Sequence, residues 1–316
     1  MVQRFADVMD IVRLGRELGF EYIYTGHHYL SYPYQMMQPI PALARLSAIT
    51  GDMDLLSTVL MPLQNPVRLA EELATLDVLT NGHVIIAPAL GYRDEEYEAF
   101  GVTREDRIRR MLEGMELMKL LWTGEEVTFD GEFTKITKAH IGIRPIQQPH
   151  PRMWMTANGD GMVRRIARMG YTWYLNPHAS FETLERQVGM YKSVRTEAGH
   201  GPVGTLPMSR ETFVAETRQQ AQDIVRPFLE GKYKTYAAWG QDKAMPGEED
   251  FTQSFDELSQ GRFIVGNPED VVNDLIKFKN IGITHASLRF GWPGTPKNVV
   301  ETAICLAAKE VLPALK

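Results

Sequence analysis

The sequence predicts an α/β protein built from repeated strand–helix units. An apolar run at residues 55–63 is followed by a helical pattern at residues 66–80 and by a second apolar run at residues 84–90. Pro66 suits the first turn of a helix, where no N–H donor is needed, and Asn81-Gly82 supplies the left-handed residue that ends one. This alternation recurs along most of the chain, which is the pattern of parallel βα units.

Seven core strands and the helices between them are expected. The strands are predicted at residues 21–25, 53–61, 83–89, 153–156, 171–175, 206–215 and 284–290. Apolar residues at helical spacing predict helices at residues 4–18, 39–50, 66–80, 105–122, 161–169, 181–198, from 217 on, 268–280 and 298–312. An eight-stranded (β/α)8 TIM barrel needs one strand more, and the chain opens on a helix. We therefore expect a TIM barrel that lacks its first strand.

The length of 316 residues suits one barrel domain covering residues 1–316, with insertions at about 123–150 and 231–262. The first insertion is predicted to hold a hairpin with a two-residue turn at Asp130-Gly131. The second breaks the strand–helix rhythm and combines clustered aromatic residues with an acidic tip. It is interpreted either as an active-site lid or as a surface excursion.

Composition narrows the function classes. The chain has 34 Lys and Arg against 40 Asp and Glu, a net charge of −6, which argues against a nucleic-acid partner. No apolar run approaches the ~20 residues that span a bilayer. The single cysteine, Cys305, excludes a disulfide within one chain and is expected to be a small buried apolar residue, which favours a reducing, cytoplasmic location. Nucleophile-elbow, Walker and complete nicotinamide motifs are missing, and so is a His-x-His pair for a metal.

Barrel enzymes work at the carboxyl ends of their strands. The strand at 21–25 is followed by His27-His28, whose side chains should point to opposite sides, so at most one faces the barrel mouth. Histidine is the usual proton carrier near neutral pH, although two polar loop residues packing locally is the alternative. Ala157, Asn158 and Gly159 precede a helix, whose free N–H groups form either an anion site or a plain turn.

Two stretches carry a family resemblance. Asn65-Pro66-Val67-Arg68 and the helix after it, ending in Asn81-Gly82-His83, and the segment 90–97, Leu-Gly-Tyr-Arg-Asp-Glu-Glu-Tyr, resemble motifs of the bacterial luciferase-like flavin-dependent monooxygenase family, and the likeness extends over residues 3–316. The resemblance implies a luciferase-like TIM barrel that uses reduced FMN, supplied by a separate flavin reductase, and O2 to oxygenate a small hydrophobic organic substrate. It also implies a homodimer.

The resemblance implies roles for particular residues. His27 or His28 would assist proton transfer beside the flavin. The flavin itself would be bound by Leu60, Met61, Asn65, Leu90, Gly91, Ala157, Asn158 and Gly159, of which the last three would hold the 5′-phosphate. The substrate pocket would include His178, Trp239 and Trp292. A helix cap is an equal alternative for Asn65. Arg93 lies among three carboxylates, a setting more typical of a solvated ion-pair cluster than of a ligand-binding residue.

The sequence departs from the family pattern at two places. Gly26 stands where relatives have a glutamate before the two histidines, and Pro88 and Ala89 replace commoner residues. Asp160 puts a negative charge close to the proposed phosphate site, where it either caps the helix or weakens binding. Two alternative functions stay open. One is a hydride-transfer oxidoreductase that uses a deazaflavin coenzyme, and the other is a non-catalytic flavin-binding homologue.

Overall fold

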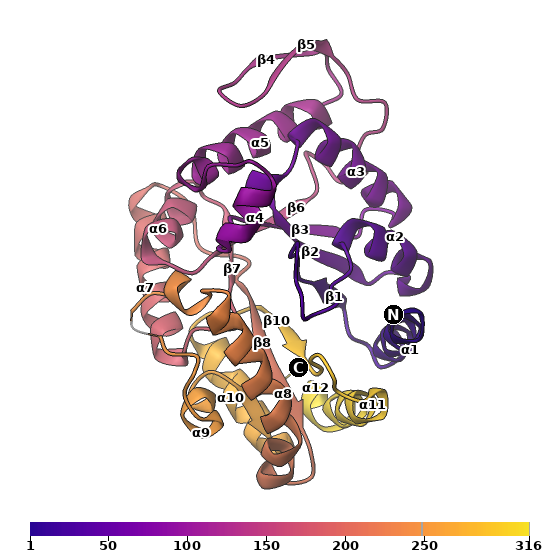
Figure 1. Ribbon diagram of the computed structural model, residues 1–316, viewed down its shortest axis with the longest axis vertical. Helices are drawn as coiled ribbons and strands as arrows, with labels where there is room; N and C mark the ends of the chain where they lie inside the picture. The colour runs from indigo at the N-terminus through magenta and orange to yellow at the C-terminus, as the bar shows by residue number, and fades with distance from the viewer. Residues whose placement is uncertain (248, 316) are drawn as a thin grey trace. The chain divides into compact units, whose positions relative to one another are not determined.

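The computed structural model describes residues 1–247 and 249–315 as an α/β protein with parallel strands (Figure 1). The chain divides into two compact units. Unit 1 is formed by Glu21–Trp154 together with Met1, and unit 2 by Val2–Phe20 together with the chain from Met155 on. The chain passes from unit 1 into unit 2 inside one strand. The single-domain organisation over residues 1–316 stays a prediction.

Unit 1 begins with alternating strands and helices. Its elements are β1 (Tyr22–Thr25), α2 (Pro39–Thr50), β2 (Asp54–Leu60), η1 (Met61–Leu63), α3 (Pro66–Leu79), β3 (Val84–Ala89), α4 (Asp94–Ala99), η2 (Arg104–Asp106), α5 (Arg107–Trp122), β4 (Val127–Asp130), β5 (Lys135–Ala139) and the first part of β6 (Arg152–Ala157). The parallel order is β1-β2-β3-β6. All residues of β3 and most of β2 are buried, as expected for a parallel sheet covered on both faces.

Two helices of unit 1, α3 and α5, lie side by side outside these strands (Figure 1). They are joined by a hydrogen bond of 3.0 Å from the indole Nε1 of Trp122 to the carbonyl oxygen of Ala70, and Trp122 is fully buried. The helix α4 was not predicted from the sequence. It has only six residues, too few for a helical period to show.

The predicted hairpin exists, but its predicted turn is wrong. Strands β4 and β5 pair antiparallel with Asp130 opposite Lys135, so residues 131–134 form a four-residue connection. The carboxylate of Glu113 on α5 accepts hydrogen bonds of 2.7–3.1 Å from the N–H groups of residues 132–134. This contact from another element stabilises the longer turn over the two-residue turn that Asp130-Gly131 favours locally.

Unit 2 continues the alternation. Its elements are α1 (Val2–Glu17), the end of β6, α6 (Asp160–Arg168), β7 (Thr172–Leu175), α7 (Phe181–Glu197), β8 (Pro207–Val214), α8 (Arg218–Ala238), η3 (Asp242–Ala244), α9 (Phe255–Ser259), β9 (Ile264–Gly266), α10 (Pro268–Asn280), β10 (His285–Arg289), α11 (Lys297–Leu306), the π-helical turn η4 (Ala307–Val311) and α12 (Leu312–Leu315). The strand order is β6-β7-β8-β10.

All seven predicted core strands are confirmed, and the residues before Gly19 form the predicted helix. The short strand β9 was missed. It pairs with the last three residues of β8, beyond the part of β8 that pairs with β10. Three residues are too few to show an alternating pattern.

Two further expectations for unit 2 are corrected. The second insertion was predicted from residue 231, but α8 continues to Ala238, so the irregular segment begins at Trp239; position 248 within it lies outside the described residues. Cys305 is exposed rather than buried, because it lies on the side of α11 opposite to the buried Val300, Ala303 and Ile304. Within the described ranges, no helix has the length and apolar character needed to cross a bilayer.

Candidate active site

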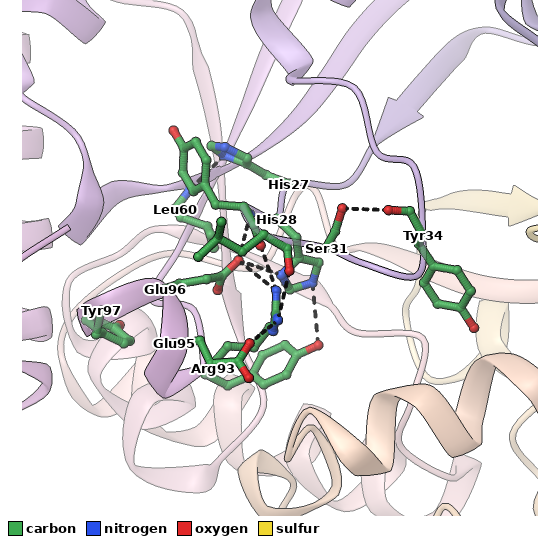
Figure 2. Close-up of polar contacts among 12 residues, drawn as sticks. His27, His28, Ser31, Tyr34, Leu60, Arg93, Glu95, Glu96 and Tyr97 are labelled. Carbon is green, nitrogen blue, oxygen red and sulfur yellow. Dashed lines mark hydrogen bonds and ion pairs between the residues drawn. The ribbon is translucent and has the colours of Figure 1, made fainter. Parts of the chain in front are cut away.

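The two histidines after β1 have different surroundings (Figure 2). His27 is buried, and both of its ring nitrogens are bonded. The backbone N–H of Leu60 donates to Nδ1 over 3.2 Å, and Nε2 lies 2.9 Å from Oε1 of Gln38. The amide nitrogen of Gln38 donates to the carbonyl oxygen of His28, which leaves its Oε1 to accept a proton from Nε2 of His27. Burial lowers the pKa of His27 to about 4, so this imidazole is neutral at neutral pH.

His28 contacts a carboxylate and a phenol. Its Nδ1 lies 3.0 Å from Oε1 of Glu96, and its Nε2 lies 3.4 Å from the hydroxyl oxygen of Tyr92. The carboxylate of Glu96 is fully buried, whereas the side chain of His28 is 11% exposed. Oε1 of Glu96 also accepts the N–H of Tyr29 over 2.8 Å. The labelled side chains of His28 and Glu96 point toward each other in Figure 2.

The segment after β3 brings Glu96 to His28. Gly91 has φ of +81°, a left-handed conformation that glycine adopts without strain, and the chain turns there toward α4. The first turn of α4 then directs Glu96 and Tyr97 into the interior. The hydroxyl of Tyr97 donates to the carbonyl oxygen of Leu90, and burial raises the pKa of Tyr97 to about 12. The phenol therefore stays protonated and remains a hydrogen-bond donor to Leu90, which fixes the loop between β3 and α4.

Arg93 was interpreted as part of a solvated ion-pair cluster; it does form ion pairs with Glu95 and Glu96, but it is buried rather than solvated. Its side chain is only 3% exposed and donates to the carbonyl oxygens of Tyr29 over 2.7 Å and Leu30 over 3.2 Å. It also contacts Glu95, at 2.5 Å. Arg93 thus ties the loop after β1 to the segment after β3. Neither Arg93 nor Glu96 was selected from the sequence, because an arginine followed by three acidic residues usually belongs to a solvated surface.

The predicted flavin-contacting residues of unit 1 occupy three settings. Leu60 and Met61 are buried in the core, and Leu60 forms a cluster with Leu63, Ala89 and Tyr97. Leu90 and Gly91 lie in the loop after β3. Asn65 is the N-cap of α3, and its Oδ1 accepts the N–H groups of Val67 and Arg68 over 3.0 and 3.1 Å. The helix-cap alternative therefore accounts for Asn65.

Ala157, Asn158 and Gly159 lead into α6 in unit 2. Gly159 is the N-cap and has no side chain to bond the first N–H groups of the helix. A Cβ added at Gly159 or Gly161 would meet no atom within 4 Å. An uncapped helix start with open space beside it suits the phosphate of FMN, because helix N-termini attract anions.

Asp160 does not oppose this anion site with a free charge. Its carboxylate accepts hydrogen bonds from Arg186 on α7, at 2.6 and 3.0 Å, and from Gln187 at 2.9 Å. The hydrogen bond from Arg186 is the main cause that lowers the pKa of Asp160. The negative charge introduced at position 160 is thereby compensated by a guanidinium of the neighbouring helix.

The predicted substrate residues of unit 2 lie around Glu211, whose carboxylate is fully buried. His178 and Trp292 are buried, and Trp239 is half-buried. The carboxylate of Glu211 accepts hydrogen bonds from Nε1 of Trp292 over 2.5 Å and from Nζ of Lys232, and Arg289 lies 3.4 Å away. Desolvation raises the pKa of Glu211, but Lys232 and Arg289 lower it more, so the group stays ionised. Burial lowers the pKa of Lys232 to about 8, which leaves it charged at neutral pH.

His178 and Trp239 join the same group through aromatic contacts. Nδ1 of His178 lies 3.3 Å from the hydroxyl of Tyr233, and its ring meets that of Tyr236 with centroids 5.4 Å apart. Tyr236 stacks on Trp239 at 5.5 Å, and Nζ of Lys232 lies 5.1 Å above the ring of Tyr236. Burial, followed by the charge of Lys232, lowers the pKa of His178 well below its usual value.

Sequence reasoning missed Lys232, Tyr233 and Tyr236 as members of this group. A signal was present, because Lys232 and Tyr236 of α8 and the C-cap residue Trp239 are spaced i, i+4 and i+7, which places them on one helical face. Assigning residues from 231 on to an insertion concealed it. The described residues contain no group of three or more His, Cys, Asp or Glu that could hold a metal ion.

Fold and site together define a class of protein, an α/β protein of repeated strand–helix units with a histidine–carboxylate pair beyond its strands. The family profile described as luciferase-like monooxygenase matches residues 1–285. The chain belongs to the luciferase-like monooxygenase family.

The relatives of this chain include named flavin-dependent monooxygenases. The oxygenase component of a flavin-dependent trigonelline monooxygenase from Acinetobacter baylyi is 26% identical over 241 residues, which is 75% of this chain and 66% of that protein. Three uncharacterised mycobacterial proteins are 32% identical over 45% of this chain, and the match spans 50% of their length. The chain thus spans between half and two thirds of these relatives.

Solved structures share the fold. Monooxygenase RslO1 from Streptomyces bottropensis has a TM-score of 0.88 at 24% identity and covers 99% of this chain and 94% of its own. The oxygenating constituent of 3,6-diketocamphane monooxygenase from Pseudomonas putida, solved in complex with FMN, has a TM-score of 0.84 at 16% identity with the same coverage. Enzymes that depend on F420 are also found with this fold.

Proposed function

We propose that this chain is a flavin-dependent monooxygenase that uses reduced FMN and O2 to oxygenate a small organic substrate. Membership of the luciferase-like family supports the class of reaction. The observation that carries the proposal is the setting of His28, a partly exposed imidazole bonded to the buried carboxylate of Glu96. A carboxylate on Nδ1 orients an imidazole and stabilises its charged form, which prepares Nε2 for proton transfer.

The two histidines have separate roles in this proposal. His28 moves protons, since it has a carboxylate partner and an accessible edge. His27 holds the start of η1 instead, because Leu60 and Gln38 occupy its two nitrogens. The low pKa of His27, about 4, supports this division, because a group that stays neutral above pH 5 does not exchange protons at pH 7.

The residues that hold FMN follow from two local settings. The uncapped start of α6, at Ala157, Asn158 and Gly159, receives the 5′-phosphate. Leu60, Met61, Leu90 and Gly91 supply the apolar surface and the backbone approach for the ring. Bound reduced FMN supplies the electrons that activate O2. Asn65 is left out of the flavin site, because its oxygen caps α3.

The aromatic group around Glu211 is proposed to contact the substrate. His178, Trp239 and Trp292 bring ring surfaces to this group, and Nδ1 of His178 and Nε1 of Trp292 contact a hydroxyl and a carboxylate inside it. The ring surfaces favour a hydrophobic substrate, because the charges of Glu211, Lys232 and Arg289 pair with one another inside the group. A separate flavin reductase as electron source and a homodimer as the working assembly complete the proposal.

An anaerobic titration with reduced FMN tests the proposal. Saturable binding, followed by a transient absorbance change when the complex is mixed with air, is the expected result. Reduced riboflavin is the matched control, and it should bind more weakly because it lacks the phosphate that α6 receives. Failure of reduced FMN to bind would overturn the proposal. Binding of a reduced deazaflavin in its place would identify a hydride-transfer enzyme, and no binding of either would favour a non-catalytic homologue.

A further inference from the structure

Three side chains of unit 1 form a continuous polar chain from the interior outward. Glu96 is fully buried, His28 is 11% exposed at its side chain, and Tyr92 is half-buried. The contacts are Glu96 Oε1 to His28 Nδ1 at 3.0 Å and His28 Nε2 to the Tyr92 hydroxyl at 3.4 Å. The rings of His28 and Tyr92 meet edge to face, with centroids 5.4 Å apart. Each end of the imidazole therefore contacts a group that can exchange or hold a proton.

We propose that Glu96, His28 and Tyr92 form a proton relay, in which Glu96 is the positioning residue and Tyr92 is the outer proton carrier. This inference rests on the proposed function, since His28 is the proton-handling residue there. The inference adds Tyr92 and Glu96, both from the segment after β3, to the proposed active site. Neither was selected from the sequence.

In the relay, each proton that enters at Tyr92 is matched by one that leaves Tyr92 for His28. No group is oxidised or reduced. With Glu96 ionised, the Nδ1–H of His28 donates to the carboxylate, and Nε2 accepts from the hydroxyl of Tyr92. A proton that reaches the phenol oxygen displaces the phenolic proton onto Nε2, which gives an imidazolium beside the carboxylate of Glu96. The reverse sequence returns the proton. The buried negative charge stabilises the imidazolium and selects the tautomer, as in other carboxylate–histidine pairs.

The carboxylate of Glu96 is fixed where the relay needs it. Oε1 accepts the N–H of Tyr29 as well as Nδ1 of His28, and Arg93 Nη1 lies 3.8 Å away. Oε2 is buried and has no hydrogen-bond partner. One oxygen shared by two donors, with a guanidinium nearby, holds the carboxylate in one orientation. The backbone bonds of Arg93 hold residues 29 and 30 in the same frame.

The first arm of the test needs no flavin. NMR of nitrogen-15-labelled protein should show the Nδ1 proton of His28 as a downfield resonance that is protected from exchange with water. Glu96→Leu should abolish that resonance, whereas Tyr92→Phe and the matched control Glu98→Gln, an exposed residue of the same helix, should retain it. If Glu96→Leu does not fold, Glu96→Gln should move the resonance upfield, because it keeps the shape and removes the charge. A His28 protonated only on Nε2, or a resonance unchanged by both substitutions of Glu96, would overturn the relay.

The second arm measures proton uptake during reoxidation of bound reduced FMN by O2, a reaction that yields oxidised FMN and hydrogen peroxide. Tyr92→Phe and Glu96→Gln should each slow the proton-dependent phase by about a hundredfold, the usual size of an acid–base contribution, and change its pH profile. Affinity for reduced FMN should stay within about twofold of wild type, as with other residues that act through protons rather than binding. Tyr32→Phe, on an 88% exposed tyrosine, and Glu98→Gln are the controls.

The two arms separate failure of the relay from failure of the proposed function. If reduced FMN binds normally and both variants reoxidise with the wild-type pH profile, the relay is overturned and the monooxygenase proposal stands. If reduced FMN binds to no form of the protein, the monooxygenase proposal fails, and the His28 resonance alone decides whether the carboxylate holds the imidazole.

Discussion

Each unit contains a buried carboxylate, but the two carboxylates have different partners. We call the first group the His28 network of unit 1 (His28, Glu96, Tyr92, Arg93). The second is the Glu211 cluster of unit 2 (Glu211, Lys232, Arg289, Trp292). In the first, a buried carboxylate faces an imidazole, a group with one nitrogen that donates a proton and one that accepts a proton. In the second, a buried carboxylate faces an ammonium and a guanidinium, which hold their charges at neutral pH. The comparison shows that the partner decides the role of a buried carboxylate. Beside an imidazole it can assist proton transfer, and beside an ammonium and a guanidinium it forms a permanent ion pair.

The largest expected effect is the removal of Glu211. Glu211→Ala leaves Lys232 and Arg289 without their buried counter-charge, and breaking a buried pair in this way costs about 3–5 kcal/mol. Chemical denaturation at pH 7 measures the loss. The matched variant Glu96→Ala should cost less, because the hydrogen-bond partner that it leaves behind is an imidazole rather than an ammonium. Equal losses for the two variants would contradict the distinction between the two clusters.

The second effect is a pH dependence that originates at His27. Its pKa is about 4 in the folded chain and about 6.5 when unfolded, so the unfolded state binds more protons between these values. Stability is therefore present above pH 6.5 and is lost as the pH falls toward 4, by up to about 3 kcal/mol.

Replacing His27 tests this assignment. His27→Asn should flatten the fall in the free energy of unfolding between pH 6.5 and 4. His140→Asn, which changes a histidine whose side chain is 56% exposed, should leave the slope as in wild type. A slope unaffected by His27→Asn would assign the pH dependence to other groups.

Local patterns predicted the strand–helix framework because each core strand and most helices carry their own signals. The helix α3 shows this well, since Asn65, Pro66 and the Asn81-Gly82 stop define it within 18 residues of sequence. Elements that depend on distant partners were not predictable in this way. The turn at residues 131–134 is held by Glu113, and β9 exists only as a partner of β8.

The site was predictable in part for the same reason. His27 and His28 were found from their position after a strand, but their separate roles depend on Gln38, Leu60 and Glu96, which come from three other segments. The carboxylate expected beside the histidines is absent at Gly26, and Glu96 lies against His28 instead. The spacing of residues along the chain does not reveal that a carboxylate from a distant segment takes the place of the one missing at position 26.

A third prediction concerns the loop that brings Glu96 to His28. Gly91→Ala places a side chain at φ of +81° and a Cβ 3.4 Å from Cδ2 of Leu60. A non-glycine residue in this region costs about 1–2 kcal/mol. Chemical denaturation should show that loss of stability. NMR should show a weaker hydrogen bond between His28 and Glu96. Gly189→Ala on α7, where a Cβ meets open space, should stabilise the chain by about 0.5–1 kcal/mol instead. A neutral Gly91→Ala would show that the loop tolerates another path.

The smallest effect compares two helix starts. The helix α3 in unit 1 is capped by the side chain of Asn65, whereas α6 in unit 2 begins at Gly159 without a side-chain cap. Asn65→Ala should destabilise the chain by about 1 kcal/mol and leave the affinity for reduced FMN unchanged, because its oxygen serves the helix. Gly159→Asn should leave stability nearly unchanged, since glycine itself is a fair N-cap, but should weaken binding of reduced FMN by placing an amide where the phosphate is received. Loss of FMN affinity in Asn65→Ala with unaltered stability would return Asn65 to the flavin site and make the two helix starts alike in function.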